Sequence, residues 1–150
     1  MDKLIVEVGS TCTKFDMYNG SKIEHLASEC IEFKRNYKKE NKLDQNDVTS
    51  LINKVNEYKN DADDVYVCGT SIFRNLTDMQ RKEFFTTFKK STGINFEIIN
   101  QEKENELTVI GATKNITNKV AVFVGGGGST EIAIYENGIK EVANTRYWSN

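Results

Sequence analysis

The stretch that decides the fold is VFVGGGGSTE, residues 122–131, because its pattern also opens the chain as VEVGSTCTKF, residues 6–15. In both stretches an apolar strand pattern runs into glycine and then into serine and threonine. A glycine turn after a buried strand lets backbone N–H groups converge on an anion without obstruction by a Cβ atom. Gly9 alone is more typical of a hairpin turn, whereas four consecutive glycines favour ligand binding. Two such turns facing each other would hold a row of phosphates.

Around these turns the sequence alternates between strand and helix patterns. Asn19-Gly20 and Asn137-Gly138 are strong hairpin signals, and Thr77 with Gln80 forms a capping box at the start of a helix. Residues 34–46 are polar and predict a solvated loop. The predicted strands are residues 3–8, 13–18, 21–33, 65–68, 95–99, 120–124, 130–135 and 139–142. The predicted helices are residues 47–60, 78–92 and 100–114.

The end of the chain repeats the strand pattern of its beginning but not the helices that follow it. We therefore expect residues 1–117 to form a first lobe and residues 118–150 to begin a second, incomplete lobe. A set of strands without helices leaves apolar side chains uncovered. These side chains would pack on the first lobe, on another copy of the chain or on a missing C-terminal lobe; they are Val122, Val124, Ile132 and Ile134.

Composition excludes several classes of protein. The 150 residues include 20 Lys and Arg against 22 Asp and Glu, a formal net charge of −2 that gives no signal for nucleic-acid binding. The longest apolar run, residues 120–124, is far shorter than the roughly 20 residues of a membrane span. Three irregularly spaced cysteines, Cys12, Cys30 and Cys68, favour reduced thiols and a cytoplasmic protein. His25, the single histidine, argues against histidine metal clusters and a Ser-His-Asp triad.

Four motifs in order resemble one known family. Besides the two glycine turns, they are TSIFR at residues 70–74 and IINQEKENELTVIGA at residues 98–112. Together they resemble the N-terminal half of the exopolyphosphatase and guanosine pentaphosphate phosphohydrolase (Ppx/GppA) family, within the actin–hexokinase–Hsp70 superfamily. The resemblance implies an α/β, ribonuclease-H-like fold of the actin-like ATPase type. It would have a mixed five-stranded sheet with helices and a C-terminal β-set that begins a second lobe.

The resemblance also implies roles for individual residues. Arg74 would clamp a phosphate and Glu104 would activate the attacking water, while Glu7 and Glu131 would hold Mg²⁺. The first phosphate loop would consist of Gly9, Ser10, Thr11 and Cys12. The second phosphate loop would consist of Gly126, Gly127, Gly128, Ser129 and Thr130.

These residue types suit phosphoryl transfer, which needs donors around the phosphate oxygens and a positioned base for water. The planar fork of an arginine fits phosphate. Without the resemblance, Arg74 is equally typical of a surface arginine. Glu102, Glu104 and Glu106 are likewise ordinary for the first turn of a helix, where the helix dipole favours acidic residues. The basic side chains of residues 34–42 favour a solvated loop over a polyanion contact.

The chain departs from the family pattern at four positions. Glu7 stands where the family has aspartate, which keeps a carboxylate for a hard cation. Val124 replaces the aspartate of the second loop, and Glu106 replaces an arginine. Cys12 is a weaker donor than the serine of the family motif. These changes weaken the expectation of catalysis while leaving the phosphate cradle largely in place.

The sequence therefore predicts a phosphohydrolase that releases terminal phosphate from inorganic polyphosphate or from a phosphorylated guanine nucleotide with Mg²⁺. The 150-residue chain alone would be weak or inactive. One alternative is a non-catalytic phosphate- or nucleotide-binding module. Another is an ATPase of the same superfamily that activates an enzyme, because the G-S-T-x-T-K pattern of residues 9–14 also occurs in such activators. No nucleic-acid or membrane partner is expected, and a homo-oligomer remains open.

Overall fold

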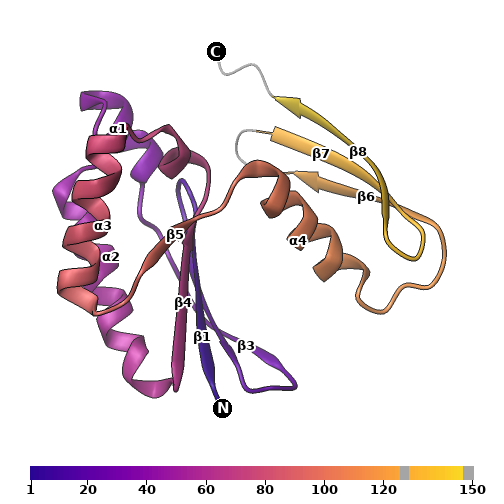
Figure 1. Cartoon of the computed structure of the whole chain (residues 1–150), viewed down its shortest axis with the longest axis horizontal. Helices are drawn as coiled ribbons and strands as arrows, with labels where there is room; N and C mark the ends of the chain where they lie inside the picture. The colour runs from indigo at the N-terminus through magenta and orange to yellow at the C-terminus, as the bar shows by residue number, and fades with distance from the viewer. Residues whose placement is uncertain (126–128, 147–150) are drawn as a thin grey trace. The chain divides into compact units, whose positions relative to one another are not determined.

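The computed structural model describes residues 1–125 and 129–146, which divide into two compact units (Figure 1). Unit 1 covers Met1–Ile99 and unit 2 begins at Asn100. The elements of unit 1 are β1 (Lys3–Val8), β2 (Thr13–Tyr18), β3 (Ile23–Glu29), α1 (Phe33–Glu40), α2 (Gln45–Tyr58), the 3₁₀ turn η1 (Lys59–Asp61), β4 (Asp64–Gly69), the 3₁₀ turn η2 (Ser71–Asn75), α3 (Asp78–Thr92) and β5 (Phe96–Ile98). Those of unit 2 are α4 (Gln101–Thr113), β6 (Val120–Gly125), β7 (Ser129–Tyr135) and β8 (Ile139–Arg146).

Unit 1 contains the predicted mixed sheet of five strands, in the order β3-β2-β1-β4-β5. β1, β2 and β3 pair antiparallel, as the Asn19-Gly20 turn predicts, and β1, β4 and β5 run parallel. Parallel strands end at the same edge of a sheet, and the loops after them usually carry ligand sites. We call the edge where Val8, Gly69 and Ile98 end these strands the carboxyl edge.

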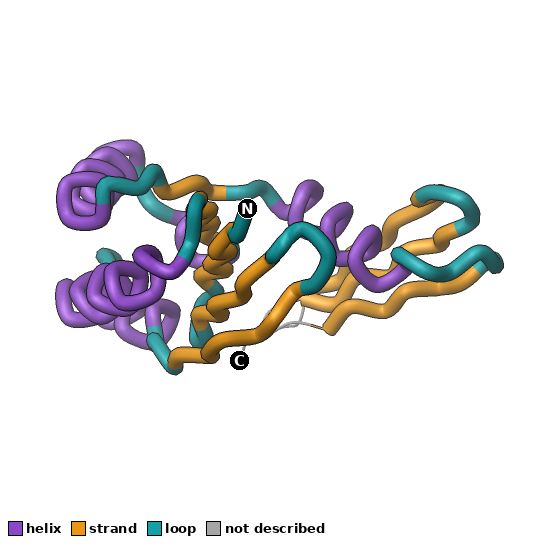
Figure 2. The backbone as a smooth tube through the Cα atoms, turned by 90° about the horizontal axis from the view of Figure 1, so that it is seen from below, coloured by secondary structure: helices purple, strands orange, loops and turns teal. Residues whose placement is uncertain are grey.

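The core of unit 1 lies between this sheet and the helices α1–α3, which lie on one side of it (Figure 2). Alternate residues of β1, namely Leu4, Val6 and Val8, have no exposed surface, which is the period of two expected of a strand with one covered face. Phe73 of η2 packs at the centre. Its ring lies 5.0–5.4 Å from three other aromatic rings, those of Phe33, Phe84 and Phe96.

The prediction of a solvated loop over residues 34–46 was wrong for its first half, because residues 33–40 form the helix α1. Phe33 and Tyr37 lie one turn apart, are 1% and 7% exposed, and join the core. Asn41 ends the helix in the left-handed region, with φ of 56°. Two buried positions among many charged ones are too few to reveal a helical period.

Local caps set the boundaries of the other helices. Asp44 accepts hydrogen bonds from two backbone N–H groups at the start of α2. Thr77 and Gln80 form the predicted capping box of α3, and Gly93 ends that helix with φ of 78°. Asn100 caps α4 by accepting a hydrogen bond from the N–H of Lys103. In these places a local polar side chain satisfies N–H groups that the helix itself leaves unbonded.

Unit 2 is a three-stranded antiparallel sheet, β6-β7-β8, with α4 against it (Figure 1). Val109 of α4 and Ala133 of β7 are buried, and Val122 pairs opposite Ala133 on the same face. The β-set therefore has a helix over one face, and α4 clusters with it in unit 2. The assignment of residues 118–150 to a second lobe stays a prediction.

Candidate functional site

The first glycine loop, Gly9 to Cys12, lies at the carboxyl edge between β1 and β2. The N–H of Gly9 donates to the carbonyl oxygen of Cys12 at 3.0 Å and closes the turn. The hydroxyl of Ser10 donates to Oγ of Ser71 at 2.6 Å. The carbonyl of Ser10 accepts a hydrogen bond from the N–H of Lys34 at 2.9 Å. The loop is thus held to the turn that follows β4 and to the start of α1.

The turn η2 places Arg74 at the same edge. The N–H of Thr70 donates to the carbonyl oxygen of Val8 at 3.1 Å, which continues the pairing of β4 with β1 into the turn. Ser71 then adopts φ of 50°, a left-handed conformation that is costly for a residue other than glycine. Phe73 is fully buried and fixes the turn, and Arg74 donates from Nη1 to the carbonyl oxygen of Ile99 at 3.1 Å.

The carboxyl edge of unit 1 therefore brings together two hydroxyls and a guanidinium, from Ser10, Ser71 and Arg74. Ser10 and Arg74 are predicted site residues. Ser71 is not among the predicted site residues, although its place in TSIFR, three residues before Arg74, was the available signal. Backbone strain persists where surrounding structure enforces it, and it gathers at functional sites. Hydroxyl and guanidinium donors of this kind suit the oxygens of phosphate.

Replacing Gly9 with alanine should weaken phosphate binding, because a Cβ atom on Gly9 would lie 2.8 Å from the carbonyl oxygen of Cys12. The loop would have to open, and the hydroxyl of Ser10 would leave its position beside Ser71. We expect a clearly higher Kd for tripolyphosphate by calorimetry. Gly111→Ala is the matched control, since a Cβ atom there has no neighbour within 4 Å. Equal affinities for both variants would contradict this account of the loop.

In unit 2 the structure distinguishes the three acidic residues of the first two turns of α4. Glu102 is exposed to solvent, and Glu106 forms an ion pair with Lys103 at 2.8 Å. Glu104 is half-buried, and its backbone N–H donates to the carbonyl of Asn100. Glu104 and Glu106 are both half-buried, so burial separates Glu102 from these two residues and not Glu104 from the other two. The role of Glu104 as general base stays a prediction.

A buried polar cluster lies between α4 and β7 in unit 2. Glu131 is only 6% exposed, and its Oε1 accepts a hydrogen bond from Nε2 of Gln101 at 2.9 Å. The same nitrogen of Gln101 donates to Oδ1 of Asn105, itself buried, at 3.0 Å. Glu131 is a predicted site residue, whereas Gln101 and Asn105 are not. Their helical spacing of four residues was the available signal.

Most of the second glycine loop lies outside the described residues. This applies to Gly126, Gly127 and Gly128, and to the side chain of Ser129. Thr130 is half-buried in β7, where it pairs opposite Gly125. The phosphate-binding role of these five residues stays a prediction.

The described residues of neither unit contain a carboxylate cluster that marks a magnesium site. Glu7 and Glu131, the two residues that the resemblance assigns to Mg²⁺, lie in different units. Oε2 of Glu7 lies 3.4 Å from Nζ of Lys14, and Glu131 is bonded to Gln101. Within residues 1–125 and 129–146, no group of three or more His, Cys, Asp or Glu side chains could hold a metal ion. We therefore derive no step through the metal.

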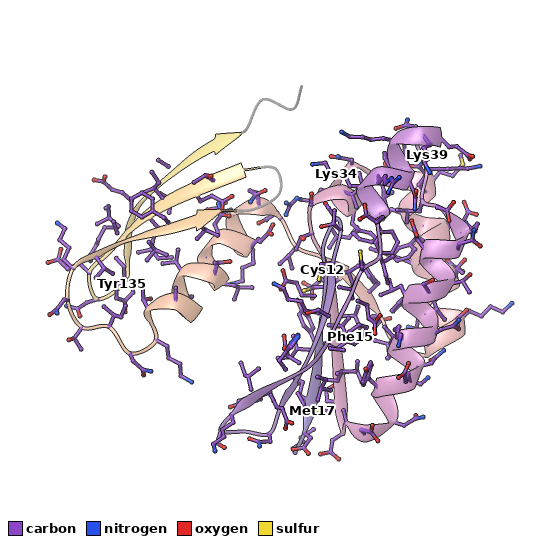
Figure 3. The ribbon with its side chains drawn as sticks, turned by 180° about the vertical axis from the view of Figure 1, so that it is seen from behind. Cys12, Phe15, Met17, Lys34, Lys39 and Tyr135 are labelled. Carbon is purple, nitrogen blue, oxygen red and sulfur yellow. The ribbon has the colours of Figure 1, made fainter. Side chains whose placement is uncertain are left out.

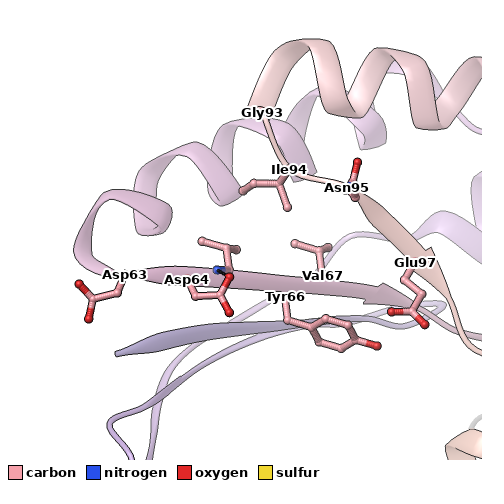
Figure 4. A pocket seen from close by; sticks show the side chains of 9 residues that line it. Asp63, Asp64, Tyr66, Val67, Gly93, Ile94, Asn95 and Glu97 are labelled. Carbon is pink, nitrogen blue, oxygen red and sulfur yellow. Dashed lines mark hydrogen bonds between the residues drawn. The ribbon is translucent and has the colours of Figure 1, made fainter. Parts of the chain in front are cut away.

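A cavity of about 460 Å³ lies in unit 1 where β4 and β5 begin, at the end of these strands opposite the carboxyl edge (Figure 4). Asp63, Asp64 and Glu97 line it. Lys3 lowers the pKa of Asp64 through a hydrogen bond and its charge, so this carboxylate stays ionised. Burial raises the pKa of Tyr66, and a hydrogen bond to Glu97 raises it further. Negative walls repel phosphate, so this cavity is not the phosphate site.

One conclusion drawn from the single histidine was too strong. Nδ1 of His25 lies 2.7 Å from Oδ1 of Asp16, and Nε2 of His25 lies 3.0 Å from Oγ of Ser28. One histidine is therefore enough to join an aspartate and a serine. His25 and Ser28 are exposed side chains of β3, a strand at the edge of the sheet. Such a network orders the surface of the strand pair.

Comparison with known families identifies the chain. The model of the Ppx/GppA phosphatase family matches residues 21–146. The chain belongs to this family. The segment that matches the Ppx/GppA model contains Arg74, Glu104 and Glu131 and begins after the first glycine loop. A comparison with curated proteins gave no match.

Solved structures share the fold at low sequence identity. A Ppx/GppA family member from Aquifex aeolicus aligns with a TM-score of 0.77 and 20% identity, over 97% of this chain and 51% of that one. An exopolyphosphatase from Cytophaga hutchinsonii aligns with a TM-score of 0.77 and 16% identity, over 97% and 50%. A Bacteroides thetaiotaomicron protein with an actin-like ATPase fold aligns with a TM-score of 0.53 and 10% identity, over 99% and 71%.

These likenesses confirm the predicted fold class, a mixed α/β fold with actin-like relatives. The chain spans about half the length of the two Ppx/GppA structures that it matches. In the described part of this Ppx/GppA chain, no helix is both long and apolar enough to cross a membrane.

Proposed function

We propose that the chain binds a row of phosphates at the carboxyl edge of unit 1 and takes part in the hydrolytic release of the terminal phosphate. The observation that carries the proposal is the convergence of Ser10, Ser71 and Arg74 at the end of three parallel strands, in a chain of the Ppx/GppA family. An exopolyphosphatase is among the proteins that share its fold. The substrate would be inorganic polyphosphate or a phosphorylated guanine nucleotide.

The roles follow from the chemistry of each group. Phosphoryl transfer spreads negative charge over the phosphate oxygens, and positioned donors stabilise that charge. Ser71, whose Oγ accepts the hydroxyl hydrogen of Ser10, would donate its own hydroxyl hydrogen to one phosphate, and Arg74 would present its guanidinium, which the carbonyl of Ile99 helps to orient. Glu104 of unit 2 would accept a proton from the attacking water. Magnesium stays an expectation from the family, and no described carboxylate cluster supports it.

A non-catalytic phosphate-binding module is the second candidate, favoured by specific observations. Val124 stands where the family motif has an aspartate, so one carboxylate is missing. The carboxylate of Glu7 forms an ion pair with Lys14. Neither feature affects the donors at the carboxyl edge of unit 1. Binding without turnover is therefore the expected behaviour of this candidate.

Phosphate release by the purified 150-residue chain separates the proposals. We expect measurable binding of polyphosphate and slow release of phosphate from polyphosphate or guanosine pentaphosphate, with less release from ATP. Binding with no release from any substrate in a single-turnover assay would favour the non-catalytic module. Release from ATP above that from the other two would favour an ATPase that activates another enzyme. Absence of polyphosphate binding would contradict the phosphate site itself.

A further inference from the structure

The helix α1 lies against both loops of the candidate phosphate site. The N–H of Lys34 donates to the carbonyl of Ser10 at 2.9 Å, and the hydroxyl of Tyr37 donates to the carbonyl of Asn75 at 3.4 Å. Ser10 belongs to the first glycine loop and Asn75 ends the turn that carries Arg74. Figure 3 labels Lys34 and Lys39 on this helix and Cys12 of the first loop. Any anion chain leaving the site along α1 would therefore meet the side chains of this helix.

α1 carries four cations in an unfavourable arrangement: Lys34, Arg35, Lys38 and Lys39. Lys34 lies four residues before Lys38 and Arg35 four before Lys39, and like charges at this spacing repel each other on a helix. The first turn contains no acidic residue, and Glu32 at the N-cap makes no side-chain cap. Lys34 and Arg35 near the start of the helix also oppose its dipole, whereas the dipole favours Lys38 and Lys39 in the last turn. The helix thus carries charge that its own structure does not compensate.

Neighbouring carboxylates do not relieve this charge. In the part of the chain that the structure describes, none of the four cations forms an ion pair. Glu40 forms its ion pair with Lys42, and Asp47 accepts a hydrogen bond from the amide of Asn36. A bound polyanion would neutralise these cations.

We propose that α1 extends the phosphate site and binds the distal part of a long inorganic polyphosphate chain whose terminal phosphate lies at Ser10, Ser71 and Arg74. This inference rests on the proposed function. Eight residues of helix are about 12 Å long, so only a chain longer than a short phosphate oligomer can contact the whole length of α1. The aromatic residues of α1, Phe33 and Tyr37, are buried, which leaves no surface for stacking of bases. Recognition is therefore by charge, which fits polyphosphate better than a nucleic acid.

The test compares two triple variants of the full chain. The first variant removes three cations from α1 by the substitutions Lys34→Gln, Arg35→Gln and Lys38→Gln. Glutamine is as good a helix former as lysine, so the helix should be retained. The matched control removes three exposed cations from α3 by the substitutions Lys82→Gln, Lys89→Gln and Lys90→Gln. The probes are tripolyphosphate and a long-chain polyphosphate, with Kd measured by calorimetry at two salt concentrations.

We expect the α1 variant to lose roughly tenfold in affinity for the long chain and to show a weaker salt dependence, as for other losses of phosphate contacts. It should lose clearly less affinity for tripolyphosphate, which can reach only the start of α1, and the α3 variant should match the wild type with both probes. Equal losses in the two variants would overturn the proposal, because they would reflect net charge alone. Unchanged long-chain affinity in the α1 variant would overturn it as well.

A second measurement uses the repulsion within α1. Without any polyanion, the α1 variant should have a higher Tm than the wild type, since the like-charge pairs are gone. Long-chain polyphosphate should raise the Tm of the wild type more than that of the variant. A lower Tm of the unliganded variant would show that the cations stabilise the fold, and would contradict a binding role.

The two proposals fail in different ways. If the wild type binds neither tripolyphosphate nor long-chain polyphosphate, the proposed function is wrong, and so is the proposed role of α1. If the wild type binds tripolyphosphate and binds long-chain polyphosphate no more tightly, only the proposed role of α1 is wrong. A single-stranded oligonucleotide of matched charge is the last probe. Binding as tight as that of polyphosphate, with the same dependence on α1, would overturn the choice of polyphosphate.

Discussion

Replacing Glu104 with glutamine should lower the rate of phosphate release by about 10²–10⁴-fold while leaving the Kd for polyphosphate unchanged. Glutamine keeps the size and polarity of the side chain but cannot accept the proton of the attacking water. Glu104 is half-buried on α4, and Glu106, which is also half-buried, forms an ion pair with Lys103. The measurement is single-turnover release of phosphate from polyphosphate with the chain in excess, which detects slow turnover.

Glu102→Gln is the matched control, because Glu102 lies two residues away in the same helix and is exposed. Its loss should change the rate little. Both carboxylates interact similarly with the dipole of α4, so the difference between the variants isolates the effect on chemistry. Small and equal effects at the two positions would mean that Glu104 serves only the helix.

Replacing Phe73 with alanine should destabilise unit 1 by about 3–5 kcal/mol, the typical cost of removing a fully buried aromatic side chain. Its ring lies 5.0–5.4 Å from the rings of Phe33, Phe84 and Phe96, so three contacts are lost together. Total stabilities of domains are about 5–15 kcal/mol, and the variant should be partly unfolded at modest urea concentrations. The measurement is urea unfolding followed by far-ultraviolet circular dichroism.

Phe123→Ala is the comparison, because Phe123 is 69% exposed and its loss should change stability by less than about 0.5 kcal/mol. Phe73→Leu keeps much of the volume and should fall between the two. Phe73 directly precedes Arg74, so its alanine variant should also lose phosphate affinity under conditions where it remains folded. Similar unfolding midpoints for Phe73→Ala and Phe123→Ala would contradict the central position of Phe73 in the core.

The parts of the fold that the sequence predicts are those controlled by neighbouring residues. Alternating buried residues define β1, and the side chains of Asp44, Thr77 and Asn100 start their helices. α1 was missed because its position depends on bonds to Ser10 and Asn75, which are distant in the sequence.

The candidate site divides in the same way. Glycine, arginine and glutamate motifs indicate which residues carry the chemistry, but Ser71 gains its role from a contact with Ser10 across 61 positions. Gly69 is a further example. A Cβ atom there would lie 2.6 Å from the ring of Phe96, so only glycine fits, and the strand pattern does not reveal this.

The order of the parallel strands has a consequence for folding. β1 pairs with β4 and β4 with β5, so the donors at the carboxyl edge come from segments that are distant in the sequence, with 61 positions between Ser10 and Ser71. Pairing between distant strands forms late, since it must first overcome the entropy of closing a long loop. During synthesis the first glycine loop would therefore emerge well before Ser71 and Arg74 could join it. Phosphate binding would begin only when most of unit 1 has been synthesised. Binding of phosphate to a nascent chain would therefore indicate that β1 and β4 have paired.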